Sequence, residues 1–167
     1  MKLIKLLPFL ALSLAFAGCS SYQLGSDLPD SIQTVALIVE NKTDEPSIEV
    51  ETMKSIRKEV QIDGRLVLRS EAEADVVLKV ELTGYSLGAL AYDSTRGSLA
   101  REYRVNMSGN AVLYDAETGD VLREVPNVTG NTDFAYDADL TAGKRTALLD
   151  AADDLARKVV SMTIAAW

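Results

Sequence analysis

The sequence of 167 residues contains no histidine and only one cysteine. Histidine is the commonest general base and the commonest metal ligand, so its absence removes the simplest routes to acid–base catalysis and metal binding. One cysteine forms no disulfide within the chain and provides too few thiolates for a zinc site. The sequence therefore indicates neither an enzyme nor a metal centre, and it predicts no cofactor other than a covalent lipid.

Basic residues are also scarce, with 17 Lys and Arg against 25 Asp and Glu and a net charge of −8. Nucleic-acid affinity depends on cations that neutralise phosphates, so this balance argues against a nucleic-acid partner. Contact with an anionic lipid has to be local, through a few placed cations. The chain has only four prolines and is 47% hydrophobic, which is typical of a folded domain.

The N-terminus has the pattern of an export signal. Lys2 and Lys5 precede an apolar run over residues 6–16, which is shorter than the ~20 residues that span a bilayer. The sequence Phe16-Ala-Gly-Cys19 then resembles the lipobox of bacterial lipoproteins. We expect residues 1–18 to be removed and Cys19 to carry the lipid. The alternative is an ordinary signal peptide, which leaves a lone thiol in an oxidising compartment.

The mature N-terminus predicts a location at the outer membrane. Ser20 and Ser21 follow Cys19, without the aspartate that retains lipoproteins at the inner membrane in enteric sorting rules. Residues 19–31 are expected to form a tether, and residues 32–167 a single domain. From Ser20 to Asp30 the tether spans at most about 35–40 Å. We therefore expect a lipid-anchored domain on the periplasmic side of the outer membrane.

The hydrophobic pattern predicts one small mixed or antiparallel sheet with two helices packed on one face, an α+β two-layer sandwich. A first strand, 34–39, is apolar on both faces and is expected to be central. A glycine interrupts the alternation of the third strand at Gly84, which predicts a β-bulge. Pro126 places the fifth strand at an edge. The expected order is β-α-β-β-β-β-α, with strands at 34–39, 66–69, 74–87, 101–114 and 121–129 and helices at 46–63 and 141–166.

Both helices show an apolar stripe. In the first, Met53, Ile56 and Val60 share a face, Thr43 or Asp44 is expected to cap the start, and Asp63-Gly64 the end. In the second, Leu148, Leu155 and Met162 recur at seven residues. The pairs Asp153–Arg157 and Asp154–Lys158 have helical spacing and are expected to form a solvated face. Asp133, Asp137 and Asp139 are better explained by capping of this helix than by calcium binding.

Several stretches together resemble the lipopolysaccharide-assembly lipoprotein family LptE. They share its order and spacing over nearly the whole mature chain and comprise residues 19–25, 28–37, 41–43, 63–67, 73–80 and the helix ending in Trp167. The resemblance implies a fold of two helices on a small mixed sheet. It also implies a role as a plug inside the large outer-membrane barrel LptD, assisting lipopolysaccharide to reach the outer leaflet.

The hairpin expected at Gly88–Ala100 is the segment best suited to such insertion. Tyr92 and Arg96 lie in it, with Arg101 and Arg104 just beyond. Guanidinium groups pair with phosphates, so these residues are candidate contacts for lipopolysaccharide or the barrel. The alternative is that Arg101 and Arg104 pair with Glu102 or with cross-strand acids. Lys144 and Arg145 form a second, weaker candidate pair.

Two other functions remain open at this point. One is a periplasm-facing regulatory lipoprotein that activates a cell-wall enzyme or nucleates a secretion assembly. The short tether argues against it, because a regulator of the cell wall has to cross the periplasm. The other is a lipid-carrying chaperone with an enclosed cavity. Two helices and one sheet leave little interior room for such a cavity, which argues against this function.

Overall fold

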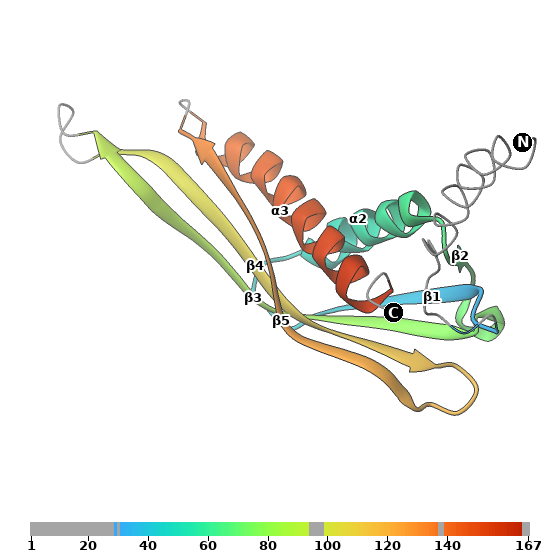
Figure 1. Ribbon diagram of the computed structural model, residues 1–167. Coiled ribbons are helices and arrows are strands. Elements are labelled where there is room, and N and C mark those ends of the chain that lie inside the picture. Colours follow the sequence, from blue (N-terminus) through green and yellow to red (C-terminus); the bar gives the residue numbers. More distant parts are fainter. Residues whose placement is uncertain (1–28, 30, 94–98, 137–138, 165–167) are drawn as a thin grey trace, which may run out of the picture.

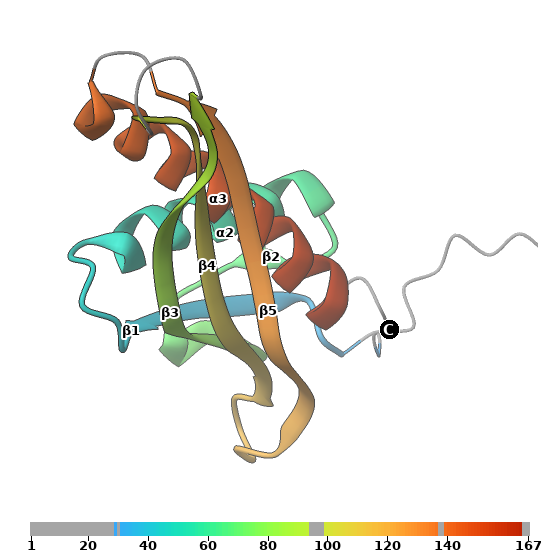
Figure 2. The same ribbon diagram turned by 90° about the vertical axis from the view of Figure 1, so that its left-hand side faces the viewer.

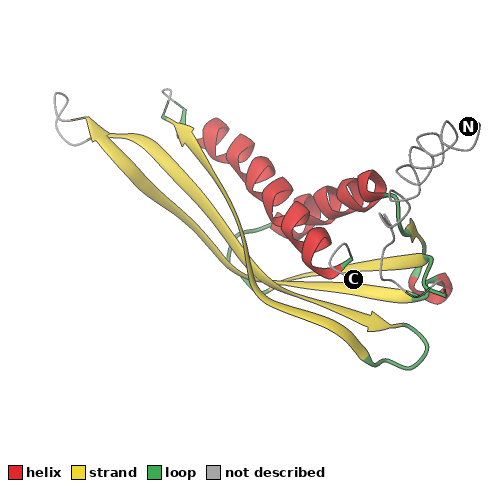
Figure 3. Ribbon diagram, viewed as in Figure 1, coloured by secondary structure: helices red, strands yellow, loops and turns green. Residues whose placement is uncertain are grey.

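The computed structural model describes Pro29 and residues 31–93, 99–136 and 139–164. These residues form a curved five-stranded sheet with two helices on the inner side of its bend (Figures 1 and 3). The elements are β1 (Thr34–Asn41), α2 (Ile48–Asp63), β2 (Val67–Leu68), a 3₁₀ turn (Glu71–Glu73), β3 (Val76–Asp93), β4 (Leu99–Asp115), β5 (Val121–Ala135) and α3 (Leu140–Thr163).

The sheet is mixed, with strand order β2-β1-β3-β4-β5. β1 is parallel to both β2 and β3, because the chain crosses over through α2 between them. β3, β4 and β5 are antiparallel neighbours joined by hairpins. In the side view of Figure 2, both helices lie against the same face. The predicted fold class and element order are therefore confirmed.

The core lies between that face and the helices. Leu78 and Leu82 of β3, Met107 and Leu113 of β4, and Leu155 of α3 are all fully buried. Burying each such side chain contributes about 1.5–3 kcal/mol relative to leaving it exposed. The predicted alternation of apolar and polar residues along β3 and β4 therefore corresponds to side chains that point alternately into the core and away from it.

The predicted bulge at Gly84 is present as a register shift between Leu82 and Gly84 against β4. The hairpin prediction was wrong in its length. β3 continues to Asp93 and β4 begins at Leu99, so the strands occupy most of Gly88–Ala100. The loop was expected to begin at Gly88, but this residue lies within β3. It is exposed, and a Cβ atom added there would meet no atom within 4 Å.

β5 is an edge strand, as Pro126 predicts, but it extends to Ala135 instead of residue 129. The strand bulges where Pro126 and Asn127 face a single residue of β4, and Asn127 has a left-handed φ of 53°. Beyond this bulge the side chains are mostly polar, which concealed the strand in the sequence.

The sequence located the end of α2 and the start of α3 correctly, but not the start of α2. Gly64 terminates α2 with φ 72°, and Asp139 caps α3 by accepting from the N–H groups of Thr141 and Ala142. The N-terminal caps expected for α2, Thr43 or Asp44, were wrong. The helix begins after Ser47, without a side-chain cap, and Thr43 instead donates to Asn41 Oδ1 in the preceding turn. Met162 was expected in the core, yet it is 42% exposed, whereas the next residue, Thr163, is fully buried. A seven-residue repeat drifts around a straight helix, so by residue 162 it has left the face that packs on the sheet.

Candidate functional site

A three-stranded arm continues from the core and contains several of the candidate residues. The arm comprises residues 85–93 of β3, 99–107 of β4 and 130–135 of β5, and its β3–β4 end projects past the helices (Figure 1). Tyr92 pairs with Ala100 near the end of the arm and is 63% exposed, and Leu90 is 44% exposed. The arm therefore presents apolar and aromatic side chains to its surroundings.

An aromatic cluster lies about halfway along this arm, near the end of β5. The rings of Tyr103 and Phe134 stack with centroids 5.7 Å apart, and Tyr136 lies 6.3 Å from Tyr103 at a tilt. Phe134 also packs against Gly143 in the first turns of α3, where a Cβ atom would meet its ring. Sequence reasoning missed Phe134 and Tyr136 because the fifth strand was ended at residue 129.

The two arginines of β4 have different surroundings. Arg104 donates through Nε and Nη2 to the two oxygens of Asp133 on β5, at 2.5 and 2.6 Å. The Arg104 guanidinium holds the pKa of the Asp133 carboxyl below its usual value. Arg104 thus has the cross-strand acid that the alternative interpretation expected. Arg101 is exposed and forms no ion pair with any described residue.

Lys144, in the second turn of α3, is engaged by the body of the protein. Its ammonium forms an ion pair with Glu45 at 2.9 Å and lies 5.3 Å from the ring centroid of Tyr85. The Glu45 carboxylate accordingly raises the pKa of Lys144. Its neighbour Arg145 is exposed. Lys144 therefore fixes the start of α3 beside the arm.

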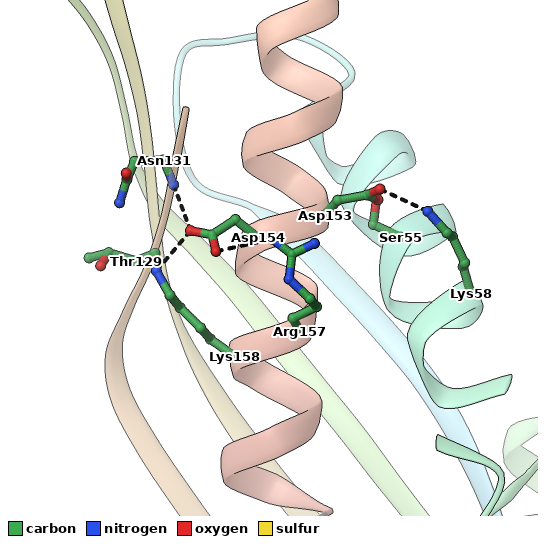
Figure 4. Close-up of polar contacts among 8 residues, drawn as sticks. All are labelled: Ser55, Lys58, Thr129, Asn131, Asp153, Asp154, Arg157 and Lys158. Carbon is green, nitrogen blue, oxygen red and sulfur yellow. Dashed lines mark hydrogen bonds and ion pairs between the residues drawn. The ribbon is translucent and has the colours of Figure 1, made fainter. Parts of the chain in front are cut away.

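A polar network fixes the middle of α3 on both sides (Figure 4). Asp153 points to α2, where it accepts from Ser55 Oγ at 2.6 Å and pairs with Lys58 Nζ at 2.9 Å. Asp154 points to β5, where it accepts from the Asn131 N–H at 3.0 Å and pairs with Lys158. The Asp154–Lys158 prediction is confirmed. The predicted Asp153–Arg157 pair was wrong. Arg157 forms an ion pair with Asp154, whereas Asp153 contacts residues of the neighbouring helix α2.

Cys19 and Arg96 lie outside the described residues, as does Asp137. Within the described part of the chain, no group of three or more His, Cys, Asp or Glu is placed to hold a metal ion. No described helix has both the length and the hydropathy needed to span a membrane.

Solved structures of low sequence identity share this fold. The PelC dodecamer of Paraburkholderia phytofirmans matches with a TM-score of 0.55 and 16% identity, over 82% of this chain and 93% of that chain. A protein from Xanthomonas campestris matches with a TM-score of 0.58 and 11% identity, over 80% and 84%. Lipoprotein B of Nitrosomonas europaea gives 0.51 and 13%, over 79% and 84%.

No curated protein sequence matches the chain. The family model described as "LptE: Lipopolysaccharide-assembly" matches residues 32–163, which is more than half of the chain. This span includes both helices, all five strands and the whole arm. The chain therefore belongs to the LptE lipopolysaccharide-assembly family.

Proposed function

We propose that this protein is an outer-membrane lipoprotein that inserts its arm into the lumen of an LptD-like barrel and assists lipopolysaccharide to the outer leaflet. In this role Cys19 bears the lipid and the tether holds the domain on the periplasmic side. The family membership supports the proposal. The role is one of placement and binding, with no bond made or broken by the chain.

The arm is the observation that carries the proposal. It projects past the helices, is stiffened by Tyr103 and Phe134, and exposes Leu90 and Tyr92 near its end. A rigid, narrow projection of this kind suits insertion into a lumen, because a flexible loop would lose more conformational entropy on ordering.

Arg101 is the described residue best placed to meet an anionic head group. Its guanidinium is exposed and unpaired among the described residues, whereas Arg104 is held by Asp133. The chain as a whole is acidic, with a net charge of −8. A phosphate is therefore attracted only where exposed cations such as Arg101 outweigh the surrounding acidic residues. Arg96 is the second candidate from the sequence, and we propose that both contact the lipid phosphates.

Charge reversal tests this contact. Arg101→Glu, alone and with Arg96→Glu, should weaken lipopolysaccharide binding by about ten-fold or more, since a hydrogen bond to a charged group contributes about 1.5–3 kcal/mol. Lys54→Glu is the control, because Lys54 is an exposed cation on α2, outside the arm, whose ion-pair partner Glu51 lies on the same helix. All three proteins should unfold at the same temperature. Unchanged lipopolysaccharide binding would remove both arginines from the site.

A further inference from the structure

The outer edge of β1 is largely uncovered. β1 has eight residues, but β2 pairs only with Thr34 and Val35 and then leaves the sheet. On its other side β1 pairs with β3 over seven residues, from Val35 to Asn41. From residue 36 onward, β1 is therefore an edge strand within the described part of the chain.

The backbone groups at this edge have a known direction. The carbonyls of Gln33 and Val35 face β2, since they accept from the N–H groups of Val67 and Arg69. Backbone groups alternate along a strand, so those of Leu37 and Val39 face the same side. Among the described residues, no backbone hydrogen bond reaches these outward groups of Leu37 and Val39. They form a short row of unpaired donors and acceptors.

The opposite edge of the sheet is protected. In β5, Pro126 lacks an N–H group, and the Thr129 carbonyl accepts from Lys158 Nζ at 2.7 Å. Asp154 accepts from the outward N–H of Asn131. Proline and charged side chains are the usual means of preventing an edge from pairing. The fold thus closes one edge with specific residues and leaves part of the other open.

The sequence of β1 is that of a strand with neighbours on both sides. Val35, Leu37 and Val39 face the helices, while Ala36 and Ile38 on the other face are also apolar. Such a doubly apolar strand is typical of a sheet interior. This pattern predicted a central strand, yet among the described residues only Val35 has strand partners on both sides. The remaining residues of β1 have the composition of a strand with a second neighbour, which the described part of the chain does not supply.

A groove opens beside this edge where β2 leaves the sheet. It has a volume of about 490 Å³. Ala36 and Leu37 of β1 and Leu68 line it together with Arg57, Arg69, Ser70, Glu71 and Glu73. Arg57 is exposed and forms no ion pair with any described residue. The groove therefore carries charges of both signs beside the apolar residues at the edge.

We propose that an extended, mainly apolar segment of the barrel partner adds to the sheet beside Leu37 and Val39, because β1 is apolar on both faces there. This inference rests on the proposed function, which supplies the partner. Main-chain hydrogen bonds to the open edge give the affinity, and side-chain contacts with the apolar residues of β1 give the specificity. A second copy of the chain is the competing occupant, which the experiment below distinguishes.

Amide hydrogen exchange on the unmodified full chain tests the pairing directly. The chain is co-expressed with the barrel protein of its own host, and exchange is resolved residue by residue in the free chain and in the complex. The amides of Leu37 and Val39 should exchange rapidly in the free chain and at least about 100-fold more slowly in the complex. Ile38 and Glu40 face β3 and should be protected in both states.

The outcomes separate the two proposals. Failure to recover the barrel overturns the proposed function and this inference together. Recovery of the barrel with Leu37 and Val39 still exchanging rapidly overturns this inference alone. Slow exchange of both amides in a self-associated chain without barrel assigns the edge to a second copy, which also overturns it.

A backbone variant tests the same edge. Val39→Pro removes the outward N–H, a change that an edge strand tolerates, and should weaken the complex about ten-fold. Val39→Thr is the matched control, because it alters the side chain at similar size and keeps the amide. Equal binding by the two variants, both folded by circular dichroism, would contradict the pairing. Should Val39→Pro unfold, the exchange measurement on the unmodified chain decides alone.

Discussion

Asp75 shows how one side chain sets the start of the sheet. Its Oδ2 atom accepts from the N–H groups of Gln33 and Thr34 at 2.9 Å and from Thr34 Oγ1 at 2.8 Å. These bonds, the one from Gln33 foremost, lower the pKa of Asp75 from its ordinary 3.8. A carboxylate just before β3 thereby fixes the first residues of β1, the strand beside it.

Asp75→Asn should therefore lower the free energy of unfolding at neutral pH. Because the folded-state pKa is depressed, the ionised carboxylate stabilises the fold above its ordinary value of 3.8. That stabilisation is lost as the pH falls through the folded-state pKa. Urea unfolding at a series of pH values should show the difference from wild type shrinking below pH 3.8.

The control for this substitution is Asp120→Asn in the β4–β5 turn. Among the described residues, no hydrogen bond or ion pair uses the Asp120 carboxylate, whereas the backbone carbonyl of Asp120 accepts from the Asp115 N–H. Asp120→Asn should leave the unfolding curve nearly unchanged at every pH. A constant difference between Asp75→Asn and wild type across the acid range would contradict the role assigned to the Asp75 charge.

Sequence reasoning identified residues whose surroundings are local and missed those defined by distant contacts. Asp139 and Gly64 act within their own turns, so propensity alone located them. The Arg104–Asp133 pair joins residues 29 apart in the sequence, and the register of β4 against β5 that aligns them could not be read from either strand. The sequence left it open whether Arg104 was paired.

At the scale of elements, the contact between α3 and β5 depends on the absence of a side chain. A Cβ atom at Gly130 would collide with the Ala151 carbonyl and lie within 2.6 Å of Leu155 N, both on the backbone of α3. Because these are backbone atoms, no side-chain rotation can relieve the collision. Gly130 therefore allows the helix to lie directly on the edge strand, close enough for Asp154 and Lys158 to reach its backbone.

Gly130→Ala should consequently destabilise the protein by about 1–3 kcal/mol, the usual cost of overpacking a close contact. Gly88→Ala is the matched control: it makes the same chemical change on β3, where a Cβ atom would meet nothing within 4 Å. Chemical denaturation compares the midpoints of the two variants. Equal midpoints would show that α3 does not rest on Gly130.

The presence of the strands and the direction of their side chains were predictable, because successive side chains of a pleated strand point to opposite faces of the sheet. Strand length was less predictable. The outer parts of β3, β4 and β5 pair mainly through their backbones, and their mixed polar side chains carry little hydrophobic signal. The arm was for this reason expected as a loop of residues 88–100, and Tyr92 was assigned to the loop instead of to β3.

At the scale of the whole molecule, the sheet is asymmetric in two ways. It is long on the side of β3–β5, where the arm projects, and short on the side of β1 and β2. One edge is closed by proline and charged residues, and the other is partly open. A body of two helices packed on a sheet, with one projecting arm, suits a protein that occupies a defined position in a larger assembly.

Recovery of the protein with its partner tests this account most directly. The full chain, isolated from its host's membranes in mild detergent, should bring down a large outer-membrane barrel protein in a specific complex. Replacing residues 88–100 with a short glycine-serine turn should abolish that recovery while the remaining domain stays folded. Recovery with a cell-wall synthase or a secretion component, and without any barrel, would contradict the account.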